Sequence, residues 1–337
     1  MTNLQLNKYF KIWHIILLIN LLLLVSIGGF TRLTNSGLSI TNWEIFKGIL
    51  PPFNQKSWDD YFALYKSIPQ YKELNLGMSL ESFKYIFWWE YIHRLLARIV
   101  SLIFFLPLVF FLYKKYINKN NILFYILILF LFLFQGFLGW YMVKSGLSVN
   151  IDVSHFRLAA HLSGAIIIIT LIFWSYLNLK DQNLTIKNFK NRSVIFLLVF
   201  LVFIQIIFGA FTSGLDAGYI YQTWPLMNLS FVADEVSFGS FFSTEIFFDR
   251  AHIQLIHRLN AYLIFSIFVF FYVRSFKELK RLLRVPFFLL LLQIILGILT
   301  LVTGVNIYLA ALHQLTSILL VMSFLSLIFR LKNNFSC

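Results

Sequence analysis

The sequence predicts an all-α integral membrane protein with eight transmembrane helices, and three observations support this fold class. Of the 337 residues, 59% are hydrophobic and only 12% are charged, a balance typical of polytopic membrane proteins rather than of soluble domains. Eight apolar runs approach or exceed the roughly 20 residues that cross the hydrocarbon core of a bilayer. The connections between these runs also alternate between strongly basic and weakly basic.

The apolar runs give the order of the elements along the chain. The run at 12–30 is followed by no small-residue cleavage site, so it predicts a retained first helix rather than a signal peptide. The eight expected spans are 12–30, 86–113, 122–143, 156–177, 193–213, 251–273, 285–303 and 308–329.

Basic residues predict how the helices are oriented in the membrane. They gather in both tails and in the second, fourth and sixth connections, whereas most acids lie in the other connections. The positive-inside rule then places both termini in the cytoplasm. The net charge of +14 is therefore mainly a topology signal, with anionic membrane lipid as a secondary contact and with nucleic acid not expected as a partner. The basic residues are Lys8, Lys11, Lys114, Lys115, Lys119, Lys180, Lys187, Lys190, Arg192, Arg274, Lys277, Lys280, Arg281, Arg284, Arg330 and Lys332.

The two halves of the chain repeat each other. Each half has four helices, an even number, so both halves keep the same orientation. We expect two tandem four-helix bundles, 1–178 and 179–337, related by a pseudo-two-fold axis along the membrane normal. The sequence favours a helix-packing role for the repeated small residues. The matched positions are Gly28 to Thr31 with Gly209 to Thr212, and Gln135, Gly139 and Gly146 with Gln293, Gly297 and Gly304.

Four histidines recur near the starts of the second, fourth, sixth and eighth spans: His93, His161, His257 and His313. Ionisable groups at membrane depth are costly and rare, so a duplicated set indicates function. Neutral imidazole is a good iron ligand, and histidines from two neighbouring helices can bind both faces of one haem. We expect His93 with His161 at one site and His257 with His313 at another. The single cysteine, Cys337, excludes clusters and zinc sites held by several thiolates.

The remaining histidines, His14, His155 and His252, have no counterpart in the other half. Each is therefore predicted to lie at the membrane interface or to support another residue, rather than to bind iron.

Three arginines lie close to the histidines of the second and sixth spans. Arg94 and Arg258 follow His93 and His257 directly, and Arg98 lies one helical turn beyond Arg94. A guanidinium can pair with a haem propionate through two hydrogen bonds. It can equally reach out to lipid phosphate, and both interpretations stay open here.

One position distinguishes the two halves. Glu90 lies three residues before His93, on the same helix face, whereas Gln254 holds the equivalent place before His257. A carboxylate beside only one site predicts a proton acceptor or an electrostatic stabiliser there. The alternative is a hydrogen bond that orients His93. We expect Glu90 to be catalytic.

With these motifs in order, the chain resembles the haem A synthase family over nearly its whole length. Each motif is short, but their joint order is specific. The residues that carry the resemblance are Gly28 to Ser39, Trp43, Gly48, Pro51-Pro52, Glu90-x-x-His93-Arg94, Arg157-Leu-Ala-x-His161-Leu, His257-Arg258-x-x-Ala261-Tyr262 and Leu312-His313-Gln314.

The resemblance implies a membrane oxidoreductase. The charge pattern places the four repeated histidines toward the outer side of the membrane, and the composition fits a bacterial inner membrane protein or an organellar one. The resemblance also implies that His93 and His161 receive the haem O substrate, with Glu90 at the reactive edge, and that His257 and His313 hold a haem b. The implied reaction oxidises a ring methyl of haem O to a formyl group by successive hydroxylations and supplies haem A to cytochrome oxidase. Implied partners are a haem O synthase, cytochrome oxidase assembly factors, an electron-transfer partner and further copies of the chain.

Two other functions fit part of the pattern. A b-type electron-transfer cytochrome would need the four histidines but not Glu90. A proton-coupled transporter would use the histidines as a proton relay, without iron.

Overall fold

The structure is a computed structural model that describes residues 2–43, 47–147, 151–179, 192–237, 239 and 243–331. Within these ranges the chain is helical, and its one β-bridge is isolated, between Met227 and Ser230. The predicted residues Lys180, Lys187, Lys190, Lys332 and Cys337 lie outside the described ranges.

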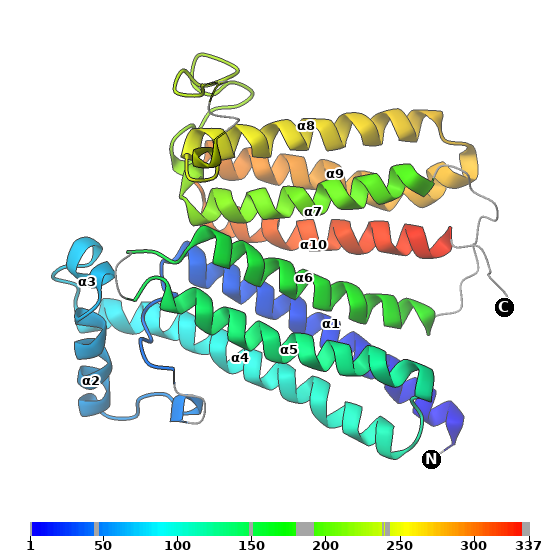
Figure 1. Ribbon diagram of the computed structural model, residues 1–337, viewed down its shortest axis with the longest axis horizontal. Coiled ribbons are helices and arrows are strands. Elements are labelled where there is room, and N and C mark those ends of the chain that lie inside the picture. Colours follow the sequence, from blue (N-terminus) through cyan, green and yellow to red (C-terminus); the bar gives the residue numbers. More distant parts are fainter. Residues whose placement is uncertain are drawn as a thin grey trace. The chain divides into compact units, whose positions relative to one another are not determined.

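Eight helices in the described ranges are long and apolar enough to cross a membrane, which confirms the predicted fold class and number of spans. Figure 1 shows these long helices in chain order. They are α1 (Asn3–Leu33), α4 (Leu80–Tyr113), α5 (Lys119–Lys144), α6 (His155–Asn178), α7 (Arg192–Gly214), α8 (Arg250–Arg274), α9 (Lys277–Val302) and α10 (Ile307–Arg330).

Two of these helices begin well before the predicted spans. Helix α1 starts at Asn3 because Thr2 and Gln5 form a capping box that satisfies backbone N–H groups at its first turn. Helix α9 starts at Lys277, with acidic Glu278 in its first turn, where a negative charge favours the helix dipole. Hydropathy detects only the apolar part of a helix, so these polar first turns lay outside the prediction.

By contacts within the chain the molecule divides into two compact units, 1–169 and 170–337, with the division inside α6. In the first unit α1 packs along α4, and α4 also contacts α5. The loop between α1 and α4 holds two short helices, α2 (Gln55–Lys66) and α3 (Pro69–Leu74). Aromatic residues of this loop form one core with the start of α4, as Figure 1 shows for the helices that carry them. That core includes Phe62, Tyr65, Phe83, Phe87 and Tyr91.

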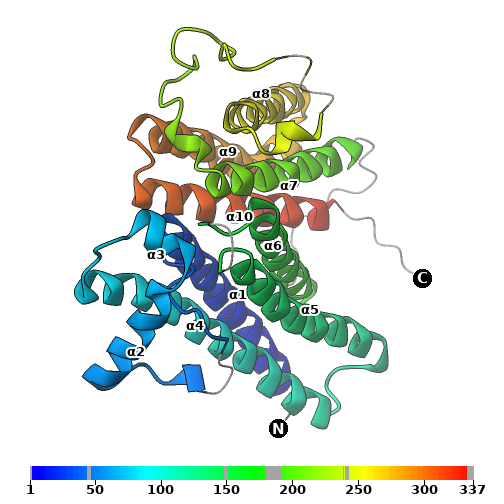
Figure 2. The same cartoon turned by 60° about the vertical axis from the view of Figure 1, so that its left-hand side comes forward.

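In the second unit four helices pack in a closed ring. Helix α7 contacts α8 and α10, and α9 contacts α8 and α10, an arrangement that can be followed in Figure 2. The loop between α7 and α8 adds a small core of its own against the start of α8, built on Tyr221, Met227 and Leu255. In each unit a loop therefore packs over the start of the helix that carries the first histidine of the pair, α4 in the first unit and α8 in the second.

Candidate functional site

Each of the four repeated histidines lies against a glycine of the preceding long helix. A Cβ atom added to Gly28 would lie 2.9 Å from Cε1 of His93, and one added to Gly297 would lie 2.8 Å from Cε1 of His313. For the other two pairs the same distance is 3.3 Å. The helices therefore approach closely, as the small residues predicted, but the group that they accommodate is an imidazole. The pairs are Gly28 with His93, Gly139 with His161, Gly209 with His257 and Gly297 with His313.

The structure brings the histidines of each half together. In the second unit the ring centroids of His257 and His313 are 6.5 Å apart, with the ring planes at 71°. A metal bound to imidazole lies about 2 Å from the nitrogen, so two rings on opposite sides of one iron have centroids about 6 to 7 Å apart. The spacing of the second pair is therefore compatible with two axial ligands of one iron.

Accessibility separates these four histidines from the other three. His93, His161, His257 and His313 are partly buried. His14 is fully buried, with Nδ1 on the carbonyl oxygen of Phe10 at 2.8 Å. His252 is also buried, and its Nδ1 lies 2.6 Å from a carboxylate oxygen of Asp249. His155 is likewise buried, with 6% of its surface exposed.

Glutamines four residues before three of the glycines contact the histidine helices. In the second unit, Gln205 donates from Nε2 to the backbone oxygen of His257 at 2.9 Å, and Nδ1 of His313 lies 3.0 Å from the backbone oxygen of Gln293. In the first unit Gln135 donates to the backbone oxygen of His161 at 2.5 Å. An Nδ1–H that donates to a carbonyl leaves Nε2 as the basic nitrogen, the one that binds iron. Leu24 replaces glutamine at the fourth equivalent position.

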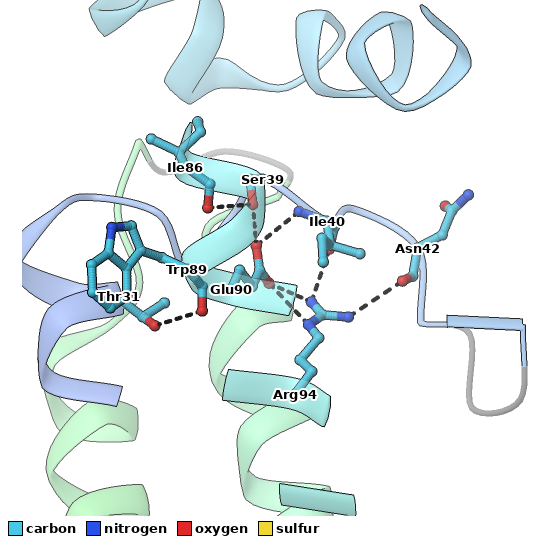
Figure 3. A network of polar contacts seen from close by, with 8 residues as sticks. All are labelled: Thr31, Ser39, Ile40, Asn42, Ile86, Trp89, Glu90 and Arg94. Carbon is cyan, nitrogen blue, oxygen red and sulfur yellow. Dashed lines mark hydrogen bonds and ion pairs between the residues drawn. The ribbon is translucent and has the colours of Figure 1, made fainter. Parts of the chain in front are cut away.

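Glu90 is buried on α4, and its carboxylate holds the loop that follows α1 (Figure 3). One oxygen accepts from Oγ of Ser39 at 2.7 Å and from the backbone N–H of Ile40 at 2.8 Å. The other accepts from Arg94, at 3.0 Å from Nε and at 2.6 Å from Nη2. A carboxylate has about four lone-pair sites, so all of them are occupied by these donors.

Arg94 uses its remaining donors on the same loop. Its Nη2 donates to the backbone oxygen of Ile40 at 2.9 Å, and its Nη1 lies 3.4 Å from that of Asn42. The guanidinium also lies 5.2 Å from the ring centroid of Trp43. We call Glu90 and Arg94, with the loop residues 39–42 that they bind, the first clamp. Arg98 lies one turn further along α4 and is partly buried.

The second unit has an equivalent clamp, formed by Gln254 and Arg258 with loop residues 217–226. Gln254 donates to the backbone oxygens of Ala217 at 2.9 Å and Tyr221 at 3.2 Å, and accepts from Arg258 at 3.2 Å. Arg258 donates to the backbone oxygens of Tyr221 and Leu226. The first loop offers donors to a carboxylate, and the second offers acceptors to an amide. The Glu90 and Gln254 difference therefore has a local cause in the loops.

The donor set of each half suits haem. Among the described residues no three His, Cys, Asp or Glu side chains converge, as a zinc site built from protein ligands would need. A haem requires only two axial ligands from the protein because the porphyrin supplies four nitrogens. Two imidazoles, carried by two different helices of the same unit, meet that requirement in each unit.

Eight helices that can span a membrane, with a pair of histidines in each half, define a class: multi-pass membrane proteins with paired histidines in their helix bundles. Comparison with known proteins gives the family. The model of the COX15-CtaA family, described as cytochrome oxidase assembly protein, matches residues 11–325, and the chain belongs to this family.

Curated relatives agree over almost the full length. The chain is 48% identical over 333 residues to a heme A synthase of Pelagibacter ubique, covering 97% of each chain. It is 43% identical to a heme A synthase of Rickettsia felis, covering 91% of this chain and 94% of the relative. A third heme A synthase, of Rickettsia massiliae, is 41% identical, with 96% and 98% covered. The resemblance inferred from the sequence motifs is confirmed.

Proposed function

We propose that this protein is a haem A synthase, an oxidoreductase of the bacterial inner membrane that converts haem O into haem A for cytochrome oxidase. The family and the names of the relatives support this function. The structural observation that carries it is the pair of His257 and His313, whose ring centroids are 6.5 Å apart. That spacing suits two axial ligands of one iron.

The two halves, 1–178 and 179–337, have different roles in this proposal. His257 and His313 hold a resident haem b, and the hydrogen bond from Nδ1 of His313 to the backbone oxygen of Gln293, at 3.0 Å, supports this assignment because it fixes one of the two rings. His93 and His161 receive the haem O substrate.

The proposed reaction oxidises one ring methyl of haem O. Each of two hydroxylations replaces one hydrogen of that methyl group by a hydroxyl whose oxygen comes from water, with the release of two electrons and two protons, and the resulting hydrated aldehyde loses water to give the formyl group. A bound haem b supplies one-electron transfer, and the electrons leave through a membrane partner. The chain itself binds the substrate ring between two helices and fixes its edge relative to the loops, which is the positioning that such chemistry needs.

Glu90 has a more limited role than that of a proton acceptor. Four donors occupy its carboxylate, so it is poorly placed to take a proton from a substrate. We propose that it acts as a fixed negative charge beside the substrate site and as the anchor of the loop there. For Arg94 and Arg258 we propose loop anchoring ahead of propionate pairing, because their donors are used in the clamps. Arg98 stays a propionate candidate.

Orientation in the membrane follows from the charge pattern. The basic tails and connections support cytoplasmic termini, with the haem sites toward the outer side. A haem O synthase, assembly factors of cytochrome oxidase and further copies of the chain are the proposed partners in the same membrane.

The experiment that tests the function is identification of the haems in the protein purified from membranes. A pyridine haemochrome spectrum and chromatography of the extracted haems should give haem B together with haem O or haem A. Haem B alone would indicate a b-type electron-transfer cytochrome instead. A protein without haem would overturn both proposals and favour the transporter.

A further inference from the structure

The four glycines that face the repeated histidines lie directly against the imidazole rings, not merely against the neighbouring helix. For Gly28, Gly139 and Gly297 the three atoms nearest to an added Cβ all belong to one imidazole ring, and for Gly209 the two atoms within 4 Å do. By contrast, Gly136 lies on α5 one turn before Gly139 and has nothing within 4 Å of an added Cβ. A methyl group added at any of the four glycines would therefore crowd an imidazole, whereas one added at Gly136 would crowd nothing.

The four contacts differ in how tight they are. At Gly28 and Gly297 the added Cβ would lie 2.9 and 2.8 Å from Cε1, closer than real Cβ atoms approach, so the ring would have to shift. At Gly139 and Gly209 the distance of 3.3 Å requires only a few tenths of an ångström of movement. Each half of the molecule thus contains one tight and one looser contact.

The backbone beside each glycine has a role as well. In an α-helix the carbonyl of residue i−4 points toward the N–H of residue i, so a glycine without Cβ leaves that carbonyl accessible from the side. Nδ1 of His313 uses it, at 3.0 Å from the oxygen of Gln293, four residues before Gly297. Nδ1 of each of the other three histidines makes no such hydrogen bond in the described part of the chain.

We propose that Gly28, Gly139, Gly209 and Gly297 are positioning residues for the iron-ligating imidazoles. Each glycine forms a notch that seats the Cε1 edge of its histidine against the neighbouring helix and so limits the ring positions from which a nitrogen can bind iron. The inference rests on the proposed function, because it presumes that these histidines bind haem.

The notch has a consequence that separates it from ordinary helix packing. A free imidazole can rotate away from an added methyl, whereas a ring whose Nε2 is bound to iron cannot. An alanine at Gly28 or Gly297 should therefore weaken haem binding without impairing folding, since alanine favours helix over glycine. From the usual cost of overpacking, the loss of haem affinity should be roughly 10-fold or more at the tight positions and smaller at Gly139 and Gly209.

The test compares four alanine variants with a matched control in the full-length purified protein. Gly28→Ala, Gly139→Ala, Gly209→Ala and Gly297→Ala are measured beside Gly136→Ala, and His313→Ala serves as the ligand-loss reference. The readouts are haem B retained after extensive washing, haem O affinity by titration, the low-spin absorption and electron paramagnetic resonance signals, and thermal unfolding of haem-free protein.

We expect Gly297→Ala to lose haem B and to shift its low-spin signals, Gly28→Ala to do the same for added haem O, and Gly136→Ala to match the parent protein. Unfolding of the haem-free variants should be unchanged. Parent-like haem affinity and spectra in both tight variants would overturn the notch proposal, and so would an equal change in Gly136→Ala. Those results would leave haem ligation intact, whereas retention of normal haem B by His313→Ala would reject the proposed ligands themselves. If Gly297→Ala fails to accumulate, the milder Gly209→Ala decides the same site.

Discussion

Replacing Glu90 with glutamine tests the first clamp directly, since Gln254 shows what an amide needs at this position. A glutamine at 90 can still accept from Arg94 through its oxygen. Its NH₂ group, however, would face the backbone N–H of Ile40, which now lies 2.8 Å from a carboxylate oxygen. The hydroxyl of Ser39 can turn round and accept, but a backbone N–H cannot. One buried donor is therefore left without an acceptor in Glu90→Gln.

The magnitude follows from these contacts. A buried donor without a partner costs about 1 to 3 kcal/mol, and the charged Arg94 exchanges hydrogen bonds to a carboxylate for weaker ones to a neutral amide oxygen, at about 1 kcal/mol more. A total of about 2 to 4 kcal/mol corresponds to roughly a 30- to 700-fold increase in the open population of the loop. Hydrogen exchange of a peptide covering 36–43 should accelerate by a factor in this range.

Activity gives a second measurement on the same variant. We expect Glu90→Gln to keep haem B bound and to lose formyl formation from haem O, scored by chromatography of extracted haems. Gln254→Glu is the matched control: it sets a carboxylate against the carbonyls of Ala217 and Tyr221, so it should loosen residues 217–226 and leave the first loop protected. Unchanged exchange of 36–43 in Glu90→Gln would refute the clamp reasoning.

Further predictions concern the second unit and Ser39. His257→Ala should lose haem B while added haem O still binds, and unchanged haem B content measured by pyridine haemochrome would contradict the assignment of His257. Ser39→Ala removes one of four donors to Glu90. Hydrogen exchange of 36–43 should therefore accelerate by roughly 5-fold, for the loss of about 1 kcal/mol, which is less than in Glu90→Gln. An acceleration equal to or larger than that of Glu90→Gln would contradict the sharing of the carboxylate among four donors. Burial raises the pKa of Asp249, but hydrogen bonds from the backbone and side chain of His252 outweigh it, so that pKa lies below its usual value. A carboxyl whose pKa is lowered by folding stabilises the folded state at pH values above its pKa in the unfolded chain, and this stabilisation is lost as the pH falls. The unfolding temperature of the protein should therefore exceed that of Asp249→Asn by a constant amount down to about pH 5, and the difference should shrink below about pH 4. A difference that instead grows on acidification would exclude this role of Asp249.

The sequence predicted the spans well because twenty apolar residues have one stable solution in lipid, a helix with all its backbone groups paired internally. The sequence was less informative about the loops outside the apolar spans. The helices α2 and α3 lie in a loop without long apolar runs, and their signals are local: Asn54 caps α2 through the backbone N–H of Ser57, and Pro69 opens α3.

Contacts between distant residues explain what the sequence could not specify at the site. The asymmetry of Glu90 and Gln254 was visible in the repeat, but its partner, the backbone N–H of Ile40, is 50 residues away and has no sequence signature. The repeat likewise marked Gly139 and Gly297, whose predicted role in helix packing was incomplete. Only the three-dimensional structure shows that the neighbours of these glycines are the imidazoles of His161 and His313.

The most direct measurement of the central claim is haem analysis of bacterial cells that make haem O but lack their own haem A synthase, before and after they express this protein. Haem A should appear when the protein is present and should not appear with His93→Ala. Continued accumulation of haem O without haem A, from cells whose membranes contain the protein with its haem B bound, would contradict the proposed function.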